Sequence, residues 1–134
     1  MYTRLLPLLL FLAIVTPASA SAASSCVVLQ YHHVSSDTPA STSIGVGDFE
    51  RQLGLIDQLG MQVMPLREVV AALRRGLPLP ERCLALSFDD AYVSVYRQAW
   101  PLLRRRGWPF TVFVPTRAID LGLQPYMSWN QLRE

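Results

Sequence analysis

The stretch CLALSFDD, residues 83–90, predicts a buried β-strand over residues 83–88 that ends in two adjacent carboxylates, Asp89 and Asp90. Runs of apolar and β-branched residues predict further strands at residues 27–34, 61–64 and 110–114. Apolar residues at helical spacing predict helices at residues 48–59, 66–75 and 92–106, with another helix beginning near residue 128. Pro101 is expected to kink or locally break the third of these helices. Strands that alternate with helices through short connections are expected to be parallel and covered by those helices. We therefore expect an α/β fold, either an open doubly wound sheet or part of a (β/α) barrel.

Three groups of residues follow the ends of predicted strands. His32 and His33 end the first strand, Asp89 and Asp90 follow the third, and Pro115-Thr116-Arg117 follows the fourth. Parallel α/β folds carry their chemistry at the carboxyl ends of the strands, so these groups are expected to meet at one edge. Successive residues of a strand point to opposite faces, so at most one of the two histidines is expected to line a site there.

Composition excludes several classes of protein. The chain has 134 residues, of which 51% are hydrophobic and 16% are charged, and this suits one globular domain. All 12 basic residues are Arg, which excludes a Lys-based Walker A loop and Schiff-base catalysis. The basic residues form no block of the kind that binds nucleic acid, so no nucleic-acid partner is expected. With two His and two Cys, a zinc module built only from Cys and His is not expected.

Residues 1–22 have the three-part layout of a secretory signal peptide. A short positive start with Arg4 precedes an apolar run over residues 5–15, and small residues with two A-x-A cleavage sites follow. The apolar run is much shorter than the roughly 20 residues that span a bilayer, which disfavours a membrane anchor. The mature protein is therefore expected to be exported, and to be periplasmic, associated with the outer membrane, or secreted.

Cys26 allows three interpretations. Residues 23–26 (ASSC) faintly resemble a bacterial lipoprotein processing site, at which Cys26 would be lipidated and would associate the protein with the outer membrane. Export also allows a disulfide with Cys83. The two cysteines open the first and third predicted strands. If these strands flank the second one, they lie about 9.6 Å apart, beyond the roughly 7 Å that a disulfide can bridge. Two separate, small, buried or half-buried cysteines are therefore the preferred interpretation.

The adjacent carboxylates Asp89 and Asp90 invite three explanations. They can cap the following helix and match its dipole. They can also hold Mg²⁺ in a phosphoryl-transfer site, although the sequence offers no glycine-rich phosphate cradle. In metal-assisted hydrolysis, one carboxylate binds the metal and the other acts as a base. Because neighbouring side chains point in different directions, two adjacent Asp residues can fill those two roles.

The motif at residues 86–90, LSFDD, resembles the T/S-F-D-D motif of the polysaccharide deacetylase (NodB-homology) family. Four other segments resemble parts of the same family domain: residues 29–34 (LQYHHV), 49–53, 96–107 and 110–114. The resemblance is strongest to secreted deacetylases of poly-β-1,6-N-acetylglucosamine, a biofilm polysaccharide. It implies that residues 23–134 are the N-terminal part of a distorted (β/α) barrel, with about four parallel strands and covering helices and with the C-terminal part missing.

The resemblance also implies a mechanism and a set of site residues. Asp89 would be the general base, and Asp90 would bind a divalent metal of the Zn²⁺ type that activates water against the acetamide of an N-acetylglucosamine polysaccharide. His32 matches the family's Tyr-His pair, and His32, Tyr31 and Tyr92 are expected to line the pocket. Ala91 departs from the family, which usually has Gly after the two Asp.

The family's His ligands are expected beyond residue 134, because no H-x-x-x-H motif occurs in the chain. The isolated chain is therefore expected to be inactive, since catalytic zinc sites normally have three protein ligands. Two alternatives remain open. One is a non-catalytic glycan-binding relative with aromatic sugar platforms at Tyr31, Tyr92, Trp108 and Trp129. The other is a truncated gene product without a function of its own.

Overall fold

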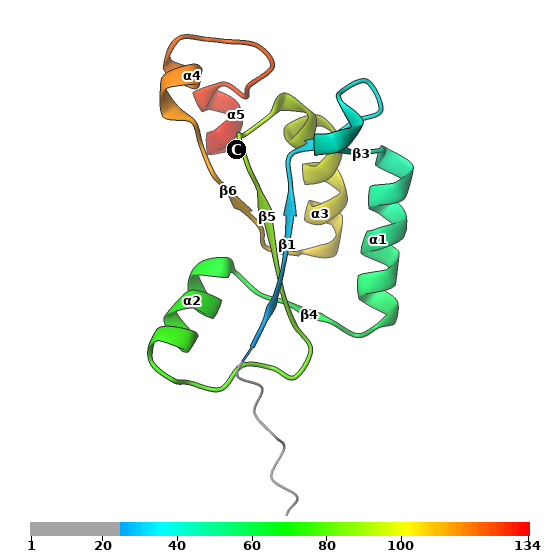
Figure 1. Cartoon of the computed structure of the whole chain (residues 1–134), viewed down its shortest axis with the longest axis vertical. Coiled ribbons are helices and arrows are strands. Elements are labelled where there is room, and N and C mark those ends of the chain that lie inside the picture. The colour runs from blue at the N-terminus through cyan, green and yellow to red at the C-terminus, as the bar shows by residue number, and fades with distance from the viewer. Residues whose placement is uncertain (1–24) are drawn as a thin grey trace, which may run out of the picture.

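Strand β5 (Cys83–Phe88) is the centre of a parallel sheet in the computed structural model, which describes residues 25–134 (Figure 1). All six of its residues are buried, as its continuous apolar run predicts. Strand β1 (Val27–Tyr31) pairs with β5 in parallel along its whole length. The predicted signal peptide, residues 1–22, lies outside the described residues. No helix within residues 25–134 has the length and apolar character needed to cross a membrane.

Two short strands share the other edge of β5. Strand β4 (Gln62–Val63) pairs with the beginning of β5, and β6 (Thr111–Val112) pairs with its end. Backbone groups of alternate β5 residues point to opposite edges. The carbonyls of Leu84 and Phe88 accept hydrogen bonds on the β4 and β6 side, whereas the N–H of Asp89 donates to Tyr31 of β1. Each short strand pairs with only part of that edge, β4 with Cys83 and Leu84 and β6 with Ser87 and Phe88. Both strands are shorter than the predicted ranges, residues 61–64 and 110–114.

The order of the strands corrects one prediction. The first and third predicted strands are direct neighbours, β1 and β5, and do not flank the second. Cys26 precedes β1, Cys83 opens β5, and their Cα atoms lie 4.7 Å apart in a disulfide. The preferred interpretation of two separate cysteines is wrong, and the disulfide alternative is confirmed. A sulfur atom in a disulfide is not available for a lipid thioether, so Cys26 is not a lipidation site in this structure.

Helices cover the sheet in the predicted alternating order. The described helices are α1 (Val46–Gln58), α2 (Leu66–Arg74), the π-helical turn η2 (Val95–Ala99), α3 (Trp100–Arg106), α4 (Thr116–Asp120) and α5 (Trp129–Arg133). The loop after β1 contains two short paired strands, β2 (His33–Val34) and β3 (Ser43–Ile44), with the 3-10 turn η1 (Ala40–Thr42) between them. Only α4 lacks a counterpart in the helices expected from the sequence.

Pro101 divides the predicted helix at residues 92–106 into two parts. Proline has no backbone N–H and its ring crowds the preceding turn, so the regular hydrogen-bond ladder is interrupted there. The N–H of Trp100 donates instead to the carbonyl of Val95, five residues earlier, which makes the preceding turn π-helical. The expected local break at Pro101 is therefore confirmed.

Tyr31 belongs to the core between β5 and α1. It is 9% exposed and stacks on Phe88 with ring centroids 5.3 Å apart, and its ring meets the Phe49 ring edge-on. Its hydroxyl donates a hydrogen bond to Gln52 Oε1 at 2.9 Å. Tyr31 thus supports the end of β1 from the core side, and it is not among the residues that line the large cavity described below.

Burial of Tyr31 predicts a loss of stability at high pH. Desolvation raises the pKa of Tyr31 to about 12, from 10.0 for the free side chain. The folded state therefore favours the neutral phenol. The resulting contribution to the free energy of unfolding is fully present below pH 10 and is lost as the pH rises from 10 to about 12. A pKa shift of about two units corresponds to about 2–3 kcal/mol of unfolding free energy. Urea unfolding at pH 9, 10 and 11 should show the decline in wild type and a weaker decline in Tyr31→Phe. Equal declines in the two proteins would contradict this assignment.

Candidate active site

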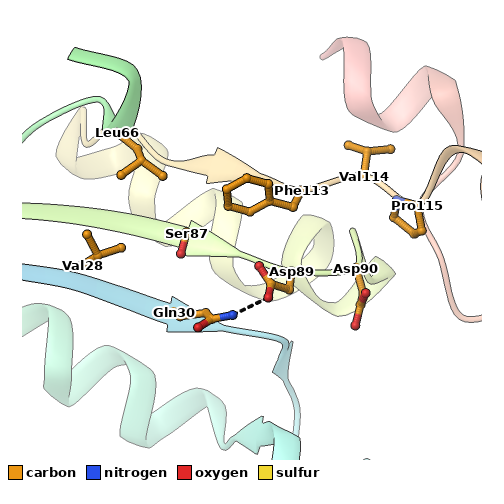
Figure 2. A pocket seen from close by; sticks show the side chains of 9 residues that line it. All are labelled: Val28, Gln30, Leu66, Ser87, Asp89, Asp90, Phe113, Val114 and Pro115. Carbon is orange, nitrogen blue, oxygen red and sulfur yellow. Dashed lines mark hydrogen bonds between the residues drawn. The ribbon is translucent and has the colours of Figure 1, made fainter. Parts of the chain in front are cut away.

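A cavity of about 680 Å³ lies along one face of the sheet and ends at the two carboxylates (Figure 2). Its polar lining comes from Gln30 of β1 and from Ser87, Asp89 and Asp90 at the end of β5. Val28 and Gln30 lie two positions apart on β1, and Ser87 and Asp89 lie two positions apart at the end of β5. Residues at this spacing face the same side of a sheet, so each pair faces the cavity. The remaining lining is apolar: Val28, Leu66, Phe113, Val114 and Pro115.

Asp89 is held against β1 by its backbone and its side chain. Its N–H donates to the carbonyl of Tyr31 at 2.8 Å, which extends the β1–β5 pairing by one residue. The side-chain amide of Gln30 donates to Asp89 Oδ2, as Figure 2 shows. His32 Nε2 lies 3.9 Å from the same oxygen, which is longer than a hydrogen bond. The side chains of Asp89 and His32 are 27% and 34% exposed, so water reaches both.

The turn after Asp89 has an unusual backbone conformation. Asp90 and Ala91 have φ angles of +66° and +49°, in the left-handed region that glycine adopts without steric cost. Ala91, where the family usually has Gly, is fully buried in this conformation. The Ala91 carbonyl accepts a hydrogen bond from the N–H of Met127 at 2.8 Å, and the N–H of Val93 donates to Pro125 at 2.9 Å. This pairing to residues 125–127 holds the turn, and the Asp90 side chain points away from Asp89 (Figure 2).

Tyr92 lies beside Asp90 but outside the large cavity. Its ring stacks between His33, with centroids 3.6 Å apart, and Tyr126, with centroids 5.3 Å apart. Desolvation, and then hydrogen bonding to the Asp90 carboxylate, raises the pKa of Tyr92 to about 12. The phenol therefore stays protonated at physiological pH and is able to donate to Asp90.

The two histidines have different surroundings, as the alternation of a strand predicts. His32 lies near Asp89, whereas His33 is 7% exposed and stacks on Tyr92. Desolvation and then the neighbouring His32 lower the pKa of His33, although Asp90 acts in the opposite direction. His33 is therefore a neutral, buried residue that supports Tyr92. Of the Pro115–Arg117 group, Pro115 lines the large cavity, and Thr116 begins α4.

Gln30 and Ser87 are site residues that the sequence analysis did not single out. Each is a polar residue within a predicted buried strand, two positions before His32 and Asp89, respectively. A residue two positions earlier faces the same side of a strand. A polar residue two positions before a candidate site residue in a buried strand is therefore the sequence signal that indicates Gln30 and Ser87.

The donor types at this site suit zinc, but the ligand set is partial. Asp90, Asp89 and His32 offer carboxylates and one imidazole, which zinc accepts as ligands. Within residues 25–134, no three His, Cys, Asp or Glu side chains gather closely enough to hold a metal ion. The described residues therefore supply donors of suitable chemistry without forming a complete metal site.

Comparison with known proteins identifies similar chains. Residues 76–134 match the family model described as "Polysaccharide deacetylase". The chain is 29% identical over 124 residues to the poly-β-1,6-N-acetyl-D-glucosamine N-deacetylase of Escherichia coli, and the match covers 81% of this chain and 18% of that enzyme.

Two solved structures show the same arrangement of elements. IcaB from Ammonifex degensii is 31% identical with a TM-score of 0.71, and the match covers 84% of this chain and 48% of IcaB. The BpsB deacetylase domain from Bordetella bronchiseptica is 25% identical with a TM-score of 0.63, and the match covers 84% of this chain and 51% of that domain. The expected α/β fold with parallel strands of the NodB-homology type is thus confirmed. The chain spans about half of these structures.

Proposed function

Because this chain belongs to the polysaccharide deacetylase family, we propose that it supplies part of a metal-dependent site that removes N-acetyl groups from an N-acetylglucosamine polysaccharide. The observation that carries this proposal is the pair Asp89 and Asp90, which ends the central strand at the rim of a large cavity. The two carboxylates point in different directions and have different neighbours. They are therefore suited to two separate roles.

Asp89 is the proposed general base. Its side chain is accessible to water, and the hydrogen bond from Gln30 fixes the orientation of the carboxylate. A base must lie within hydrogen-bond reach of the proton that it removes, so a fixed carboxylate at the cavity rim suits attack of water on an acetamide carbon. The proton of the water passes to Asp89 as the water oxygen bonds to the acetamide carbon. The C–N bond then breaks while the leaving nitrogen takes up that proton, so that acetate and a free amine on the sugar result.

Asp90 is the proposed ligand of a divalent metal, zinc in this proposal. When bound there, a zinc ion would supply Lewis-acid chemistry, lowering the pKa of a bound water and polarising the amide carbonyl. Tyr92 supports this role, because its neutral phenol lies beside Asp90 and is able to orient the carboxylate by donating to it. Hydrogen-bond partners of this kind fix the geometry of metal ligands.

Two observations support a proposal for the cellular setting. Residues 1–22 have the layout of a signal peptide, and Cys26 and Cys83 form a disulfide. Disulfides persist mainly in oxidising compartments such as the periplasm or the extracellular medium. We therefore propose an exported protein, with residues 23–134 forming part of a deacetylase domain. Poly-β-1,6-N-acetylglucosamine is the proposed substrate, because it is the substrate in the name of the Escherichia coli relative.

Acetate release from a β-1,6-linked N-acetylglucosamine oligomer tests the function. We expect the 134-residue chain with added Zn²⁺ to release no acetate, because a catalytic zinc site normally needs three protein ligands. We expect turnover from a hybrid enzyme, defined as the Escherichia coli N-deacetylase in which residues 25–134 of this chain replace the matching segment. Failure of a folded hybrid to release acetate, while the parent enzyme does so, would overturn the proposal. Turnover by the isolated chain would overturn the inactivity expected for it.

A further inference from the structure

A second cavity, of about 280 Å³, lies between the end of α4 and the beginning of α5. Trp129, the first residue of α5, lines it and is 37% exposed. The indole Nε1–H donates a hydrogen bond to Asp120 Oδ1 at 2.9 Å, and the Ser128–Gln131 capping box fixes the start of α5. The exposed ring is therefore held in place before any ligand binds, which reduces the entropy lost on binding.

The lining of this second cavity suits a neutral sugar. The described residues that line it include the rings of Trp129 and Tyr126 and the amides of Gln124 and Asn130, and none of them is charged. One face of a pyranose ring consists largely of C–H groups, which pack on an aromatic ring. Its hydroxyl and acetamido groups need polar partners of the kind that the two amides provide. A phosphate or a carboxylated ligand would find no cation among these residues.

Trp129 differs from the three other aromatic residues considered as sugar platforms. Tyr31 lies in the core, and Tyr92 is stacked between two other rings. The half-buried Trp108 has the guanidinium of Arg106 5.6 Å from its ring centroid. Trp129 is the one of the four that combines exposure with an adjoining cavity.

The segment that lines the second cavity packs against the turn that carries Asp90. Tyr126 lines the cavity and stacks on Tyr92, the neighbour of Asp90. The two backbone hydrogen bonds that join Pro125 and Met127 to residues 91–93 make the same connection. A ligand in the cavity would therefore lie at a fixed position relative to the proposed active site.

We propose that this second cavity is a subsite for a sugar residue of the polysaccharide chain whose neighbouring N-acetyl group is presented at Asp89 and Asp90. The proposal rests on the proposed function, because it takes the polysaccharide from there. It adds Trp129 as the stacking platform and Gln124 and Asn130 as the polar partners.

Binding by the full chain tests the subsite without requiring turnover. The three Trp residues give three indole N–H signals in a ¹H–¹⁵N NMR spectrum, and Trp129→Ala identifies one of them. We expect a β-1,6-linked N-acetylglucosamine oligomer to shift the Trp129 signal in wild type and in Asp89→Asn. Trp129→Ala should raise the Kd by at least about tenfold, equivalent to ~1.4 kcal/mol. Trp100→Phe, in a half-buried ring that stacks on Tyr96, is the matched control and should bind like wild type.

Three outcomes would overturn the subsite. These are unchanged affinity in Trp129→Ala, shifts confined to residues around Asp89, and no binding by the folded chain. None of them contradicts the proposed function, which acetate release by the hybrid enzyme tests separately. If Trp129→Ala fails to fold, Asn130→Ala keeps the indole and tests the same cavity. It should weaken binding, and unchanged affinity in that variant would also overturn the subsite.

Discussion

Replacing Asp89 by Asn in the hybrid enzyme is expected to lower the rate of acetate release by about a thousandfold. General bases contribute about 10²–10⁴ to the rate, and the amide of Asn is unable to accept the proton of the attacking water. The substitution preserves the size of the side chain, and the oxygen of the introduced amide is still able to accept the hydrogen bond from Gln30. The folded structure should therefore be retained, so that the loss is one of chemistry.

Asp48→Asn is the matched control for this prediction. Asp48 is an exposed carboxylate in the first turn of α1, where it pairs with Arg51. The same chemical change at that position should leave acetate release within about twofold of the hybrid's rate, since surface ion pairs contribute little. A rate for Asp89→Asn that matches the rate for Asp48→Asn would exclude Asp89 as the base.

Reduction of the Cys26–Cys83 disulfide is expected to lower the free energy of unfolding by about 4 kcal/mol. The bond joins residues 57 positions apart and therefore closes a loop that contains α1, β4 and α2. In the chain-entropy model, a cross-link of this length removes many conformations from the unfolded state. It also fixes the beginning of β1 next to the beginning of β5, at the opposite end of the strands from Asp89.

Urea unfolding of the full chain with and without a thiol reductant measures this effect. The variant in which both cysteines are replaced by Ala is the control, because reductant should not change its stability. It should unfold at a urea concentration similar to that of the reduced wild type. A change on reduction of less than about 1 kcal/mol in wild type would show that the disulfide contributes little, contrary to the loop-closure argument.

The local structure of this chain was predictable because each element has its own apolar pattern. The continuous run of β5 indicated a strand buried on both faces, and Pro101 indicated a break in the last long helix. The neighbours of β5 were not predictable in the same way. Strand pairing joins residues far apart in the sequence, and consecutive strands are often, but not always, adjacent. Strand β5 lies between β1 and the two short strands, which the sequence did not indicate. For that reason the distance between Cys26 and Cys83 was predicted to be too long for a disulfide.

The candidate site was likewise predictable in its local features but not in its contacts between distant residues. Asp89 and Asp90 were identified because they follow a buried strand, which is a local feature. The hydrogen bond between Gln30 and Asp89 depends on the register of β1 against β5, and the sequence does not state that register. The left-handed turn at Ala91 was also not expected, because Ala gives no signal for a positive φ. Backbone hydrogen bonds from a distant loop hold that conformation.

The central claim is that Asp89 and Asp90 divide two roles, base and metal ligand. Zinc affinity and acetate release, measured together on the hybrid enzyme and on its Asp89→Asn and Asp90→Asn variants, test it most directly. We predict that Asp89→Asn binds zinc within about threefold of the hybrid's affinity but loses turnover. Asp90→Asn should lose both, with zinc affinity at least about 100-fold weaker, because removing a ligand weakens a site more than removing a supporting group. Full zinc affinity in Asp90→Asn, or retained turnover in Asp89→Asn, would contradict the assignment.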